Sequence, residues 1–198
     1  KSPTVLVGRD MRVTGESLAE SFSRGVTSRG VNVVNLGLAS TDLVYFAAGS
    51  LDAPGAMFTA SHNPAEYNGI KFCLSGARPV GIDTGLAAIR DAAKEVLAGR
   101  APVAVSPVGT VTERDMLNDF ADHVVSFIDV DALIPMKVVA DTANGMGGLI
   151  VPVVFDRLPM MQLEVMYPEL DGSFPNHPAD PIQPANQRDL QARVVSGG

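Results

Sequence analysis

Short apolar runs alternate with amphipathic stretches along most of the chain. Thr4–Gly8 is a β-branched run closed by Gly-Arg-Asp, as at the end of a buried parallel strand. Glu16–Arg29 places Leu18, Phe22 and Val26 along one face of a helix. The same alternation predicts further strands at Val31–Leu36, Ala56–Thr59, Gly69–Leu74, Lys137–Asp141 and Gln162–Met166. It predicts further helices at Thr41–Gly49, Thr84–Leu97, Met116–Phe127, Asn186–Val195 and, interrupted by Pro152, Met146–Leu158.

Two of these helices have candidate capping residues. Thr41 with Asp42 offers an N-cap, and Thr112 with Asp115 resembles a capping box for the helix that follows it. In the Thr84–Leu97 helix, one apolar face is expected to point inward. Its members are Leu86, Ile89, Ala93 and Val96.

The alternation stops at Gly99–Gly109, which loses helical periodicity and contains two prolines. We interpret this segment as the boundary between two domains, at residues 1–106 and 107–198. Two units that alternate strands with helices imply an α/β fold with layered, mixed and mostly parallel sheets and right-handed crossovers.

The composition excludes some classes of function. Fifteen Lys and Arg against 22 Asp and Glu give a formal charge of -7, which disfavours a nucleic-acid partner. Cys73 is the only cysteine, so no intrachain disulfide or Cys-based zinc cluster is expected, and a reducing cytoplasmic setting fits best. No apolar run approaches the roughly 18–20 residues of a membrane helix, and no signal-peptide pattern opens the chain. We therefore expect a soluble, cytoplasmic protein without a membrane partner.

The segment Thr59–Pro64 follows a predicted strand end, where open α/β sheets place their ligands. A hydrolase nucleophile at Ser61 would need the Gly-x-Ser-x-Gly elbow, but its flanks are Ala60 and His62, and Asn63 stands where the second glycine should be. His62 is also no ready-made base, because adjacent side chains in extended backbone point to opposite sides. A polar turn explains Ser, Asn and Pro equally well, so spacing alone leaves the alternatives open.

A third interpretation is that Ser61 accepts and returns a phosphoryl group. A phosphoserine carries a charge of about -1.5 to -2 and three strong acceptor oxygens, so it needs donors and cations nearby. His62, Asn63 and Lys71 are the available side chains, and a hard divalent metal such as Mg²⁺ would complete the neutralisation.

These residues resemble a known family. Thr-Ala-Ser-His-Asn-Pro followed by Tyr67–Lys71 resembles the active-serine signature of the α-D-phosphohexomutase superfamily, of the bacterial phosphomannomutase/phosphoglucomutase type. Gly8–Arg12 resembles the family's Gly-Arg-Asp-x-Arg turn, although Thr14 and Gly15 replace the Ser-Ser pair often seen after it. Asp141–Gly145 and Asp171–Asn176 are similar to segments of the second domain, so the resemblance covers nearly the whole chain.

The resemblance implies roles for individual residues. Ser61 is expected to be the phosphoserine and, through its phosphate, a metal ligand, while His62 and Asn63 flank and orient that phosphate. Lys71 matches the family lysine proposed as general acid or base. Arg9 and Arg12 belong to a turn where an arginine is structural as readily as phosphate-facing, and we leave them out of the catalytic set.

The family's metal loop, Asp-Gly-Asp-x-Asp-Arg, does not occur in this sequence. Asp171-Gly172 is followed by serine, and neither Asp141 nor Asp171 is assigned as a ligand in its place. The family's initial strand and the loops of its third and fourth domains are missing too. We therefore expect an N-terminal fragment of a four-domain enzyme, domain 1 and part of domain 2, that is nearly inactive alone.

By resemblance, the complete protein interconverts hexose 1-phosphate and hexose 6-phosphate of mannose or glucose. It would use Mg²⁺, with hexose 1,6-bisphosphate as activator and intermediate and a small sugar phosphate as its only expected partner. Two alternatives stay open, a non-catalytic sugar-phosphate-binding or scaffold protein that keeps the fold, and a serine hydrolase.

Overall fold

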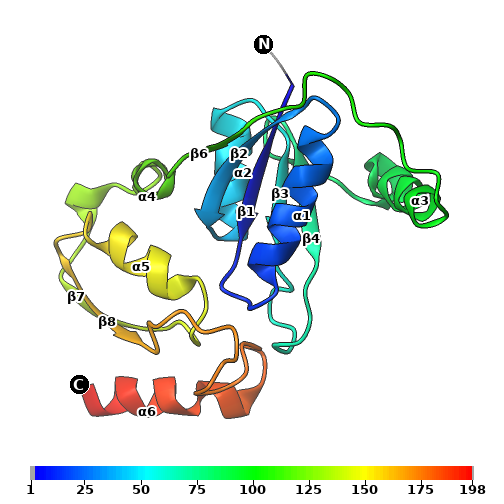
Figure 1. Cartoon of the computed structure of the whole chain (residues 1–198). Coiled ribbons are helices and arrows are strands. Elements are labelled where there is room, and N and C mark those ends of the chain that lie inside the picture. The colour runs from blue at the N-terminus through cyan, green and yellow to red at the C-terminus, as the bar shows by residue number, and fades with distance from the viewer. Residues whose placement is uncertain (1–2, 198) are drawn as a thin grey trace.

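The computed structural model describes residues 3–197, which form two β-sheets and the helices that cover them (Figure 1). The strands are β1 (Thr4–Arg9), β2 (Asn32–Leu38), β3 (Gly55–Phe58), β4 (Ile70–Leu74), β5 (Arg78–Pro79), β6 (Val111–Glu113), β7 (Met136–Asp141) and β8 (Met161–Met166). The α-helices are α1 (Gly15–Thr27), α2 (Thr41–Ser50), α3 (Leu86–Leu97), α4 (Leu117–Val125), α5 (Gly147–Phe155) and α6 (Arg188–Gly197). Short 3₁₀ turns are η1 (Ile82–Thr84), η2 (Val130–Ala132) and η3 (Pro184–Gln187).

The larger sheet has the strand order β5-β4-β3-β1-β2-β6. Strand β1 pairs in parallel with β2 and β3, and β2 pairs in parallel with β6. Strands β4 and β5 run antiparallel at one edge. The smaller sheet consists of β7 and β8 in parallel. The predicted α/β class with mixed, mostly parallel sheets is confirmed.

Both faces of the larger sheet are buried. Successive residues of a strand point to opposite faces, and Leu6 and Val7 of β1 are 0% and 1% exposed. Leu6 belongs to the core shared with α2 and α4, whereas Val7 packs with Phe58 under Phe22 of α1. Burying one such side chain stabilises the fold by about 1.5–3 kcal/mol. These two layers fix the ends of β1 and β3, from which the candidate site is built.

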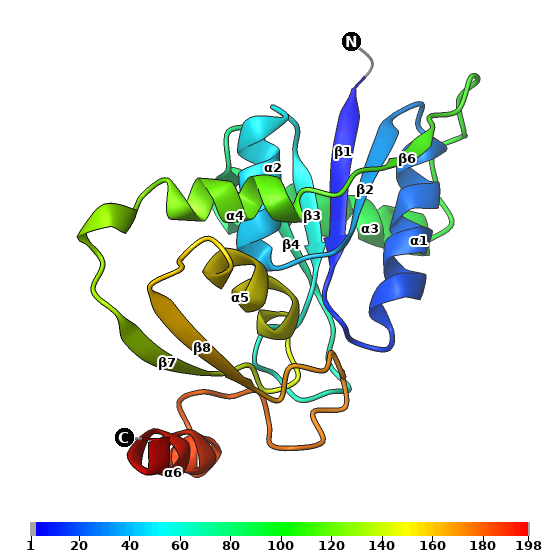
Figure 2. The same cartoon turned by 90° about the vertical axis from the view of Figure 1, so that its left-hand side faces the viewer.

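Helix α4 joins the two sheets. Its Phe120 is buried in the larger core, and Ile150 of α5 packs against the same core. Arg157, just after α5, forms an ion pair with Asp122 of α4. Figure 2 shows α4 lying across α2 with α5 beneath it. Since β6 belongs to the larger sheet, residues beyond 106 contribute to it, and the division at residue 106 stays a prediction.

The smaller sheet has α5 on one face and α6 on the other (Figure 1). Helix α5 continues through Pro152, so the predicted interruption is wrong. A proline removes only one backbone donor, and the flanking residues keep their helical hydrogen bonds. Glycine is needed at Gly148, where a Cβ would lie 1.9 Å from the carbonyl oxygen of Pro168. The close approach of α5 to the loop after β8 depends on it.

Helix α3 differs most from expectation, because none of its residues is buried. Ile89 and Val96, predicted to face inward, are 42% and 48% exposed. The antiparallel pair β4 and β5 leaves the chain at the sheet edge, and α3 lies beyond β4 (Figure 1). An amphipathic pattern predicts a helix correctly but does not say whether a sheet lies under its apolar face.

The helix caps also differ. Ser40, rather than Thr41 with Asp42, caps α2, since its Oγ accepts a hydrogen bond from the Leu43 amide at 3.1 Å. Thr112 lies in β6, and Asp115 alone accepts from the amide of Leu117 at 2.8 Å. The predicted capping box is therefore wrong, because strand pairing takes up its first residue. Across residues 3–197, no helix combines the length and apolarity that crossing a membrane requires.

Candidate active site

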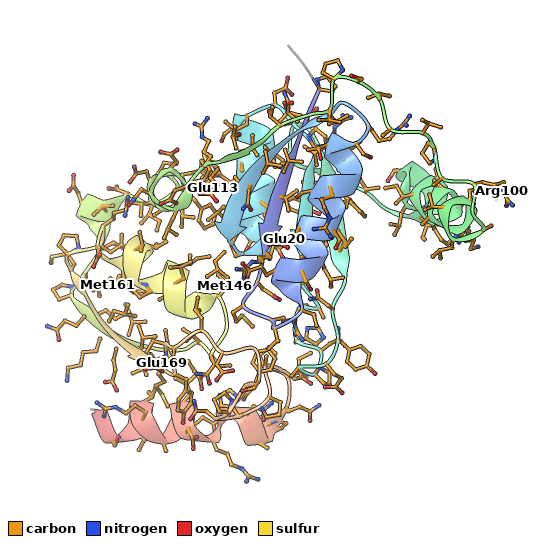
Figure 3. All side chains as sticks on the ribbon, viewed as in Figure 1. Glu20, Arg100, Glu113, Met146, Met161 and Glu169 are labelled. Atoms are coloured by element: carbon orange, nitrogen blue, oxygen red, sulfur yellow. The ribbon has the colours of Figure 1, made fainter. Side chains whose placement is uncertain are left out.

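Three parallel strands end at the same edge of the larger sheet. The carboxyl ends of β1, β2 and β3 deliver Asp10, Ser40 and Thr59 there. An open cavity of about 260 Å³ lies at this edge, lined among others by these three residues, Ser61 and Met146. Met146, labelled in Figure 3, precedes α5 and lies between that helix and the larger sheet. Side chains from both sheets therefore surround one cavity, where such sheets commonly place ligands.

Ser61 occupies an exposed turn with a left-handed backbone, at a φ of 55°. Its amide donates to Oγ1 of Thr59 at 2.9 Å, and its Oγ lies 3.3 Å from Nδ1 of His62. Our expectation that the two side chains point apart is wrong, because it assumed extended backbone. A positive φ is unfavourable for a non-glycine residue, so the surrounding loop must hold it.

Asn63 closes the same turn from within. Its Nδ2 and its amide both donate to the carbonyl oxygen of Ala60, at 2.7 and 3.1 Å. The loop is thus a well-formed polar turn, and it presents Ser61 and His62 to solvent. The turn geometry and a chemical role for Ser61 are compatible, so the turn interpretation alone does not exclude a site.

Arg12 binds the backbone of the serine loop, residues 59–67. Its side chain is fully buried, at 0% exposure, and all five guanidinium N–H groups have acceptors. The acceptors are the Asp10 carboxylate at 3.2 Å and the carbonyl oxygens of Ser61, Asn63, Pro64 and Tyr67 at 2.7–3.0 Å. Only a planar fork with five donors can satisfy this set, which a lysine cannot replace.

Asp10 explains how a charged side chain can be buried here. One carboxylate oxygen accepts from the Arg12 amide at 3.0 Å and the other from its Nε at 3.2 Å. Asp10 itself is only 4% exposed. The Gly-Arg-Asp-x-Arg motif marked this turn in the sequence. It did not indicate which of the two arginines is buried. Arg9 instead is partly buried, with its Nη2 at 3.5 Å from Oε2 of the exposed Glu16.

Lys71 lies on β4 opposite Met57, in the antiparallel pair with β3. Paired residues share a face of the sheet, and Met57 lines the cavity that contains Ser61. The lysine side chain is exposed and forms no hydrogen bond or ion pair with any residue in 3–197. The structure thus brings Ser61, His62 and Asn63 together and leaves Lys71 on the same side of the sheet without contact to Ser61.

A loop from the smaller sheet packs on the Arg12 turn. Phe174 places its ring over the Arg12 guanidinium, 5.2 Å from the ring centroid. A Cβ at Gly172 would lie 2.7 Å from the Arg12 Cα, so only glycine fits there. Phe174 also lines the cavity that contains Ser61. The motif at Asp171–Asn176 resembles the family's second domain, but the sequence gave no indication that this segment contacts the serine loop.

Asn144 organises that second loop. It is 2% exposed, its Nδ2 donates to the Glu169 carbonyl at 3.0 Å, and its Oδ1 accepts from Asn176 at 2.8 Å. Its backbone carbonyl accepts from the amide of Asp171 at 3.0 Å. One buried amide side chain therefore ties both ends of the loop to the end of β7. The side chains of Asp141 and Asp171 also accept hydrogen bonds within this part of the protein.

His177 fixes the end of the same loop. Its Nε2 lies 3.0 Å from Oδ2 of Asp141 and its Nδ1 lies 2.9 Å from the Pro178 carbonyl. Burial opposes the charged ring, but the Pro178 carbonyl and the Asp141 carboxylate outweigh it and raise the pKa of His177. The ring also meets Tyr167 edge-on, at 5.5 Å.

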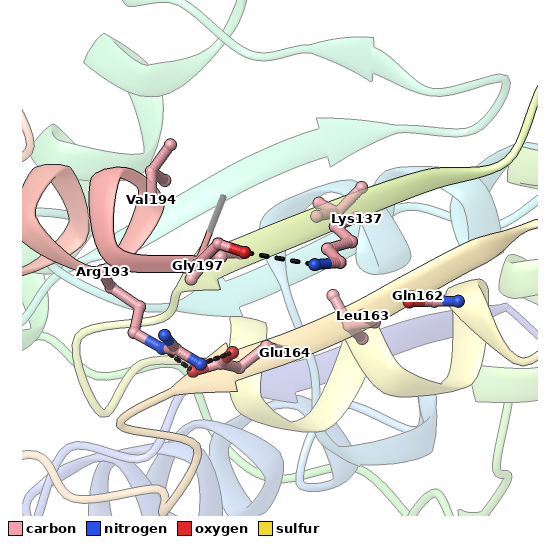
Figure 4. Close-up of a pocket in the computed structure, with 9 residues that line it drawn as sticks. Lys137, Gln162, Leu163, Glu164, Arg193, Val194 and Gly197 are labelled. Carbon is pink, nitrogen blue, oxygen red and sulfur yellow. Dashed lines mark hydrogen bonds and ion pairs between the residues drawn. The ribbon is translucent and has the colours of Figure 1, made fainter.

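A second cavity, of about 370 Å³, lies between β7, β8 and α6 (Figure 4). Its charged side chains are already paired. Lys137 donates to the Gly197 carbonyl at 3.1 Å, and Arg193 binds both carboxylate oxygens of Glu164 at 2.5 and 2.6 Å. The cations and the carboxylate of this cavity are therefore bound to one another or to the backbone, and Gln162 is its remaining polar side chain.

A magnesium site needs several oxygen donors close together. Residues 3–197 contain no cluster of three or more His, Cys, Asp or Glu side chains that could hold a metal ion. These residues by themselves do not fit a Mg²⁺ site, in line with the missing aspartate loop. A metal role for Ser61 through its phosphate stays a prediction.

The fold and loop together define an α/β protein with a serine turn at the carboxyl edge of a mostly parallel sheet. Residues 1–98 match the family described as phosphoglucomutase/phosphomannomutase, alpha/beta/alpha domain I. The chain is 38% identical over 192 residues to the phosphohexose mutases of Xanthomonas campestris pv. campestris, and 33% identical over 204 residues to the phosphomannomutase of Salmonella montevideo. These alignments cover 96% and 100% of this chain, but 42% and 44% of those proteins.

A solved structure agrees with this relationship. The crystal structure of a phosphoglucomutase/phosphomannomutase family protein from Burkholderia thailandensis superposes with a TM-score of 0.80 at 28% identity, over 98% of this chain and 42% of that one. The chain belongs to the phosphoglucomutase/phosphomannomutase family, as the sequence motifs predicted. It spans about two fifths of the length of these relatives. The roles of Ser61, His62, Asn63 and Lys71 are not tested by these similarities and stay predictions.

Proposed function

We propose that the protein containing this chain is a phosphohexomutase in which Ser61 carries the phosphoryl group. The observation that supports this most is the exposed serine on a strained turn, held by a fully buried arginine at a cavity on the carboxyl edge of the sheet. A strained backbone that is fixed by its surroundings is typical of functional sites. Family membership adds the expected substrate class, hexose 1-phosphate and hexose 6-phosphate.

The electrostatic setting supports a phosphorylated Ser61. The first residues of α2 and the residue before α5, Thr41 and Met146, line the Ser61 cavity. Helix N-termini carry partial positive charge and free N–H groups, which stabilise anions. Two carboxylates also line the cavity. Arg12 compensates the charge of Asp10, whereas the exposed Asp42 forms no ion pair with any residue in 3–197 and opposes an anion there. Phosphoryl transfer depends mainly on positioning and on the stabilisation of negative charge. The helix N-termini at this cavity would supply such stabilisation to a phosphate on Ser61.

The proposed reaction has two displacements. In the first, the O6 hydroxyl of a hexose 1-phosphate attacks the phosphorus on Ser61, the P–Oγ bond breaks, and a P–O6 bond forms. The hydroxyl proton leaves to a base and Ser61 Oγ takes up a proton, with Lys71 as the candidate for these transfers. In the second, Ser61 Oγ gives up its proton and attacks the phosphorus on O1 of the bisphosphate, the P–O1 bond breaks and a P–Oγ bond forms, and O1 takes up a proton, which restores phosphoserine and releases hexose 6-phosphate. His62, at 3.3 Å from Oγ, would orient the phosphate.

The two alternatives are weaker. A hydrolase would use His62 as the base for Ser61, and 3.3 Å is within reach, but none of the residues in 3–197 orients the other ring nitrogen of His62. A binding or scaffold protein has no need of an exposed serine on a strained turn. The three functions predict different adducts on Ser61: a phosphate for a mutase, a fluorophosphonate adduct for a hydrolase, and neither for a scaffold.

Intact-mass analysis with peptide mapping of the freshly purified protein tests the proposal. A mutase is expected to carry one phosphate on Ser61, absent in Ser61→Ala and retained in Ser50→Ala, whose exposed serine lies at the end of α2. Reaction of Ser61 with a fluorophosphonate probe would support the hydrolase instead. A protein with neither adduct, and without mutase turnover, would support the scaffold alternative.

A further inference from the structure

We propose that Arg12 is a positioning residue for Ser61, and that Phe174 from the other sheet keeps Arg12 in place. This inference rests on the proposed function, since it concerns the geometry of the same serine. It implies that the serine loop is ordered only when the 167–177 loop packs against Arg12.

The first step concerns what holds Ser61. The residue has an unfavourable positive φ, and the carbonyl of this residue is one of the four that accept from Arg12. The other three belong to Asn63, Pro64 and Tyr67, so the arginine gathers the whole turn around one planar group. Four carbonyl dipoles directed at one cation stabilise the turn, because hydrogen bonds to charged groups are stronger than neutral ones.

The second step concerns what holds Arg12. Asp10 fixes its Nε edge, and Phe174 covers the face of the guanidinium at 5.2 Å. Phe174 is 9% exposed, and its backbone has a φ of 54°, itself an unfavourable conformation. Its amide donates to the Asp171 carbonyl at 3.0 Å, and Asp171 is in turn bound to Asn144. The strain at Phe174 is thus imposed by the loop that Asn144 anchors.

The third step connects both to chemistry. Phosphoryl transfer requires the phosphorus to lie in line between the attacking and leaving oxygens, and a misplacement of about 1 Å can cost about 10²-fold in rate. Arg12 is buried and has no free donor for a phosphate, so its effect on the reaction must pass through the loop. We therefore expect its loss to lower kcat far more than it changes KM.

The test uses the protein expressed from its complete reading frame, with glucose 1-phosphate and mannose 1-phosphate as substrates. Arg12→Lys keeps the charge but offers three donors in place of a planar fork. We expect kcat to fall about 10²-fold with KM within about threefold, and amides of residues 59–67 to exchange hydrogen about tenfold faster or more. Phe174→Leu is expected to act in the same direction by about tenfold, whereas Phe174→Tyr, which keeps the ring, stays within about twofold.

The double variant Arg12→Lys/Phe174→Leu distinguishes a shared route from two separate effects. If Phe174 acts through Arg12, the kcat of the double variant should lie within about twofold of the kcat of Arg12→Lys alone. Multiplicative losses, or an unchanged loop exchange in either folded single variant, would overturn the proposal. If Arg12→Lys fails to fold, the pair Phe174→Leu and Phe174→Tyr still decides it. Faster loop exchange in the variants, together with a wild-type protein that shows no mutase turnover, would leave the positioning role intact and refute the proposed function.

Discussion

The two loops that meet at Arg12 are organised alike and present different groups to solvent. Each is centred on one buried polar side chain that binds several backbone carbonyls or partners, Arg12 in the serine loop and Asn144 in the 167–177 loop. The serine loop leaves Ser61 and His62 exposed, whereas the other loop buries Phe174 and binds the side chains of Asp171, Asn176 and His177 within the protein. A site is therefore indicated less by where polar residues occur than by which of them the fold leaves available.

Removal of the proposed carrier should have the largest effect. In the complete protein, Ser61→Ala is expected to lower kcat by about 10³-fold or more, because the covalent route disappears. The melting temperature should stay within the experimental error, since the Ser61 side chain is exposed. Coupled assays with hexose 1-phosphate measure the first, and thermal unfolding the second. Full turnover by Ser61→Ala would return the loop to a plain turn.

The isolated chain of residues 1–198 should be folded and nearly inactive. The residues described contain no metal cluster, and the chain spans about two fifths of its relatives. We expect turnover of glucose 1-phosphate or mannose 1-phosphate to be lower than that of the complete protein by about 10³-fold or more, as for loss of electrostatic stabilisation at several points. Robust turnover by the isolated chain would contradict this.

Arg12→Met tests the serine loop's organiser through stability. It removes the charge partner of the buried Asp10 carboxylate, which keeps only the hydrogen bond from the backbone amide of residue 12, and leaves four carbonyls without their donor, so we expect the free energy of unfolding in urea to fall by about 3–5 kcal/mol. Arg9→Met is the matched control from the same turn. The Arg9 side chain is only partly buried and its partner Glu16 is exposed, so a change within about 1 kcal/mol is expected. Equal losses in both variants would refute the distinction between the two arginines.

Asn144→Ala tests the second organiser in the same way. The variant leaves the Glu169 carbonyl and the Asn176 amide unpaired, and alanine tolerates the φ of 58° less well than asparagine. The expected loss in the free energy of unfolding is about 2 kcal/mol, smaller than for Arg12 because no buried charge is exposed. A loss as large as that of Arg12→Met would mean that both loops depend on their organisers equally.

The smallest effect is the pH dependence from His177. Its pKa is raised in the folded protein, above an unfolded value of about 6.5. Its contribution to stability is therefore fully present below about pH 6.5 and is lost as the pH rises through the folded pKa. The difference in the free energy of unfolding between wild type and His177→Gln should shrink from pH 6 to pH 8. A difference that grows over this range would contradict the ion pair with Asp141.

Local patterns predicted most strands and helices, because an apolar run or an amphipathic face carries its own period. They failed for the exposed face of α3 and for the capping box at Thr112, where tertiary placement decides. The site followed the same division. Ser61, His62 and Asn63 follow one another in one segment, so they could be named as candidates from the sequence, and their roles stay predictions. The choice of Arg12 over Arg9 and its contact with Phe174 depend on segments far apart in the sequence.

The most direct test of the account follows the phosphate on Ser61. The complete protein, labelled with ³²P on Ser61 by incubation with labelled hexose 1,6-bisphosphate, is mixed with excess unlabelled hexose 1-phosphate in a single turnover. We predict that the label leaves Ser61 and appears in hexose bisphosphate and hexose 6-phosphate, and that Ser61→Ala takes up no label. Label that stays on the protein, or leaves only as inorganic phosphate, would contradict the assignment of Ser61 as the carrier between two positions of a hexose.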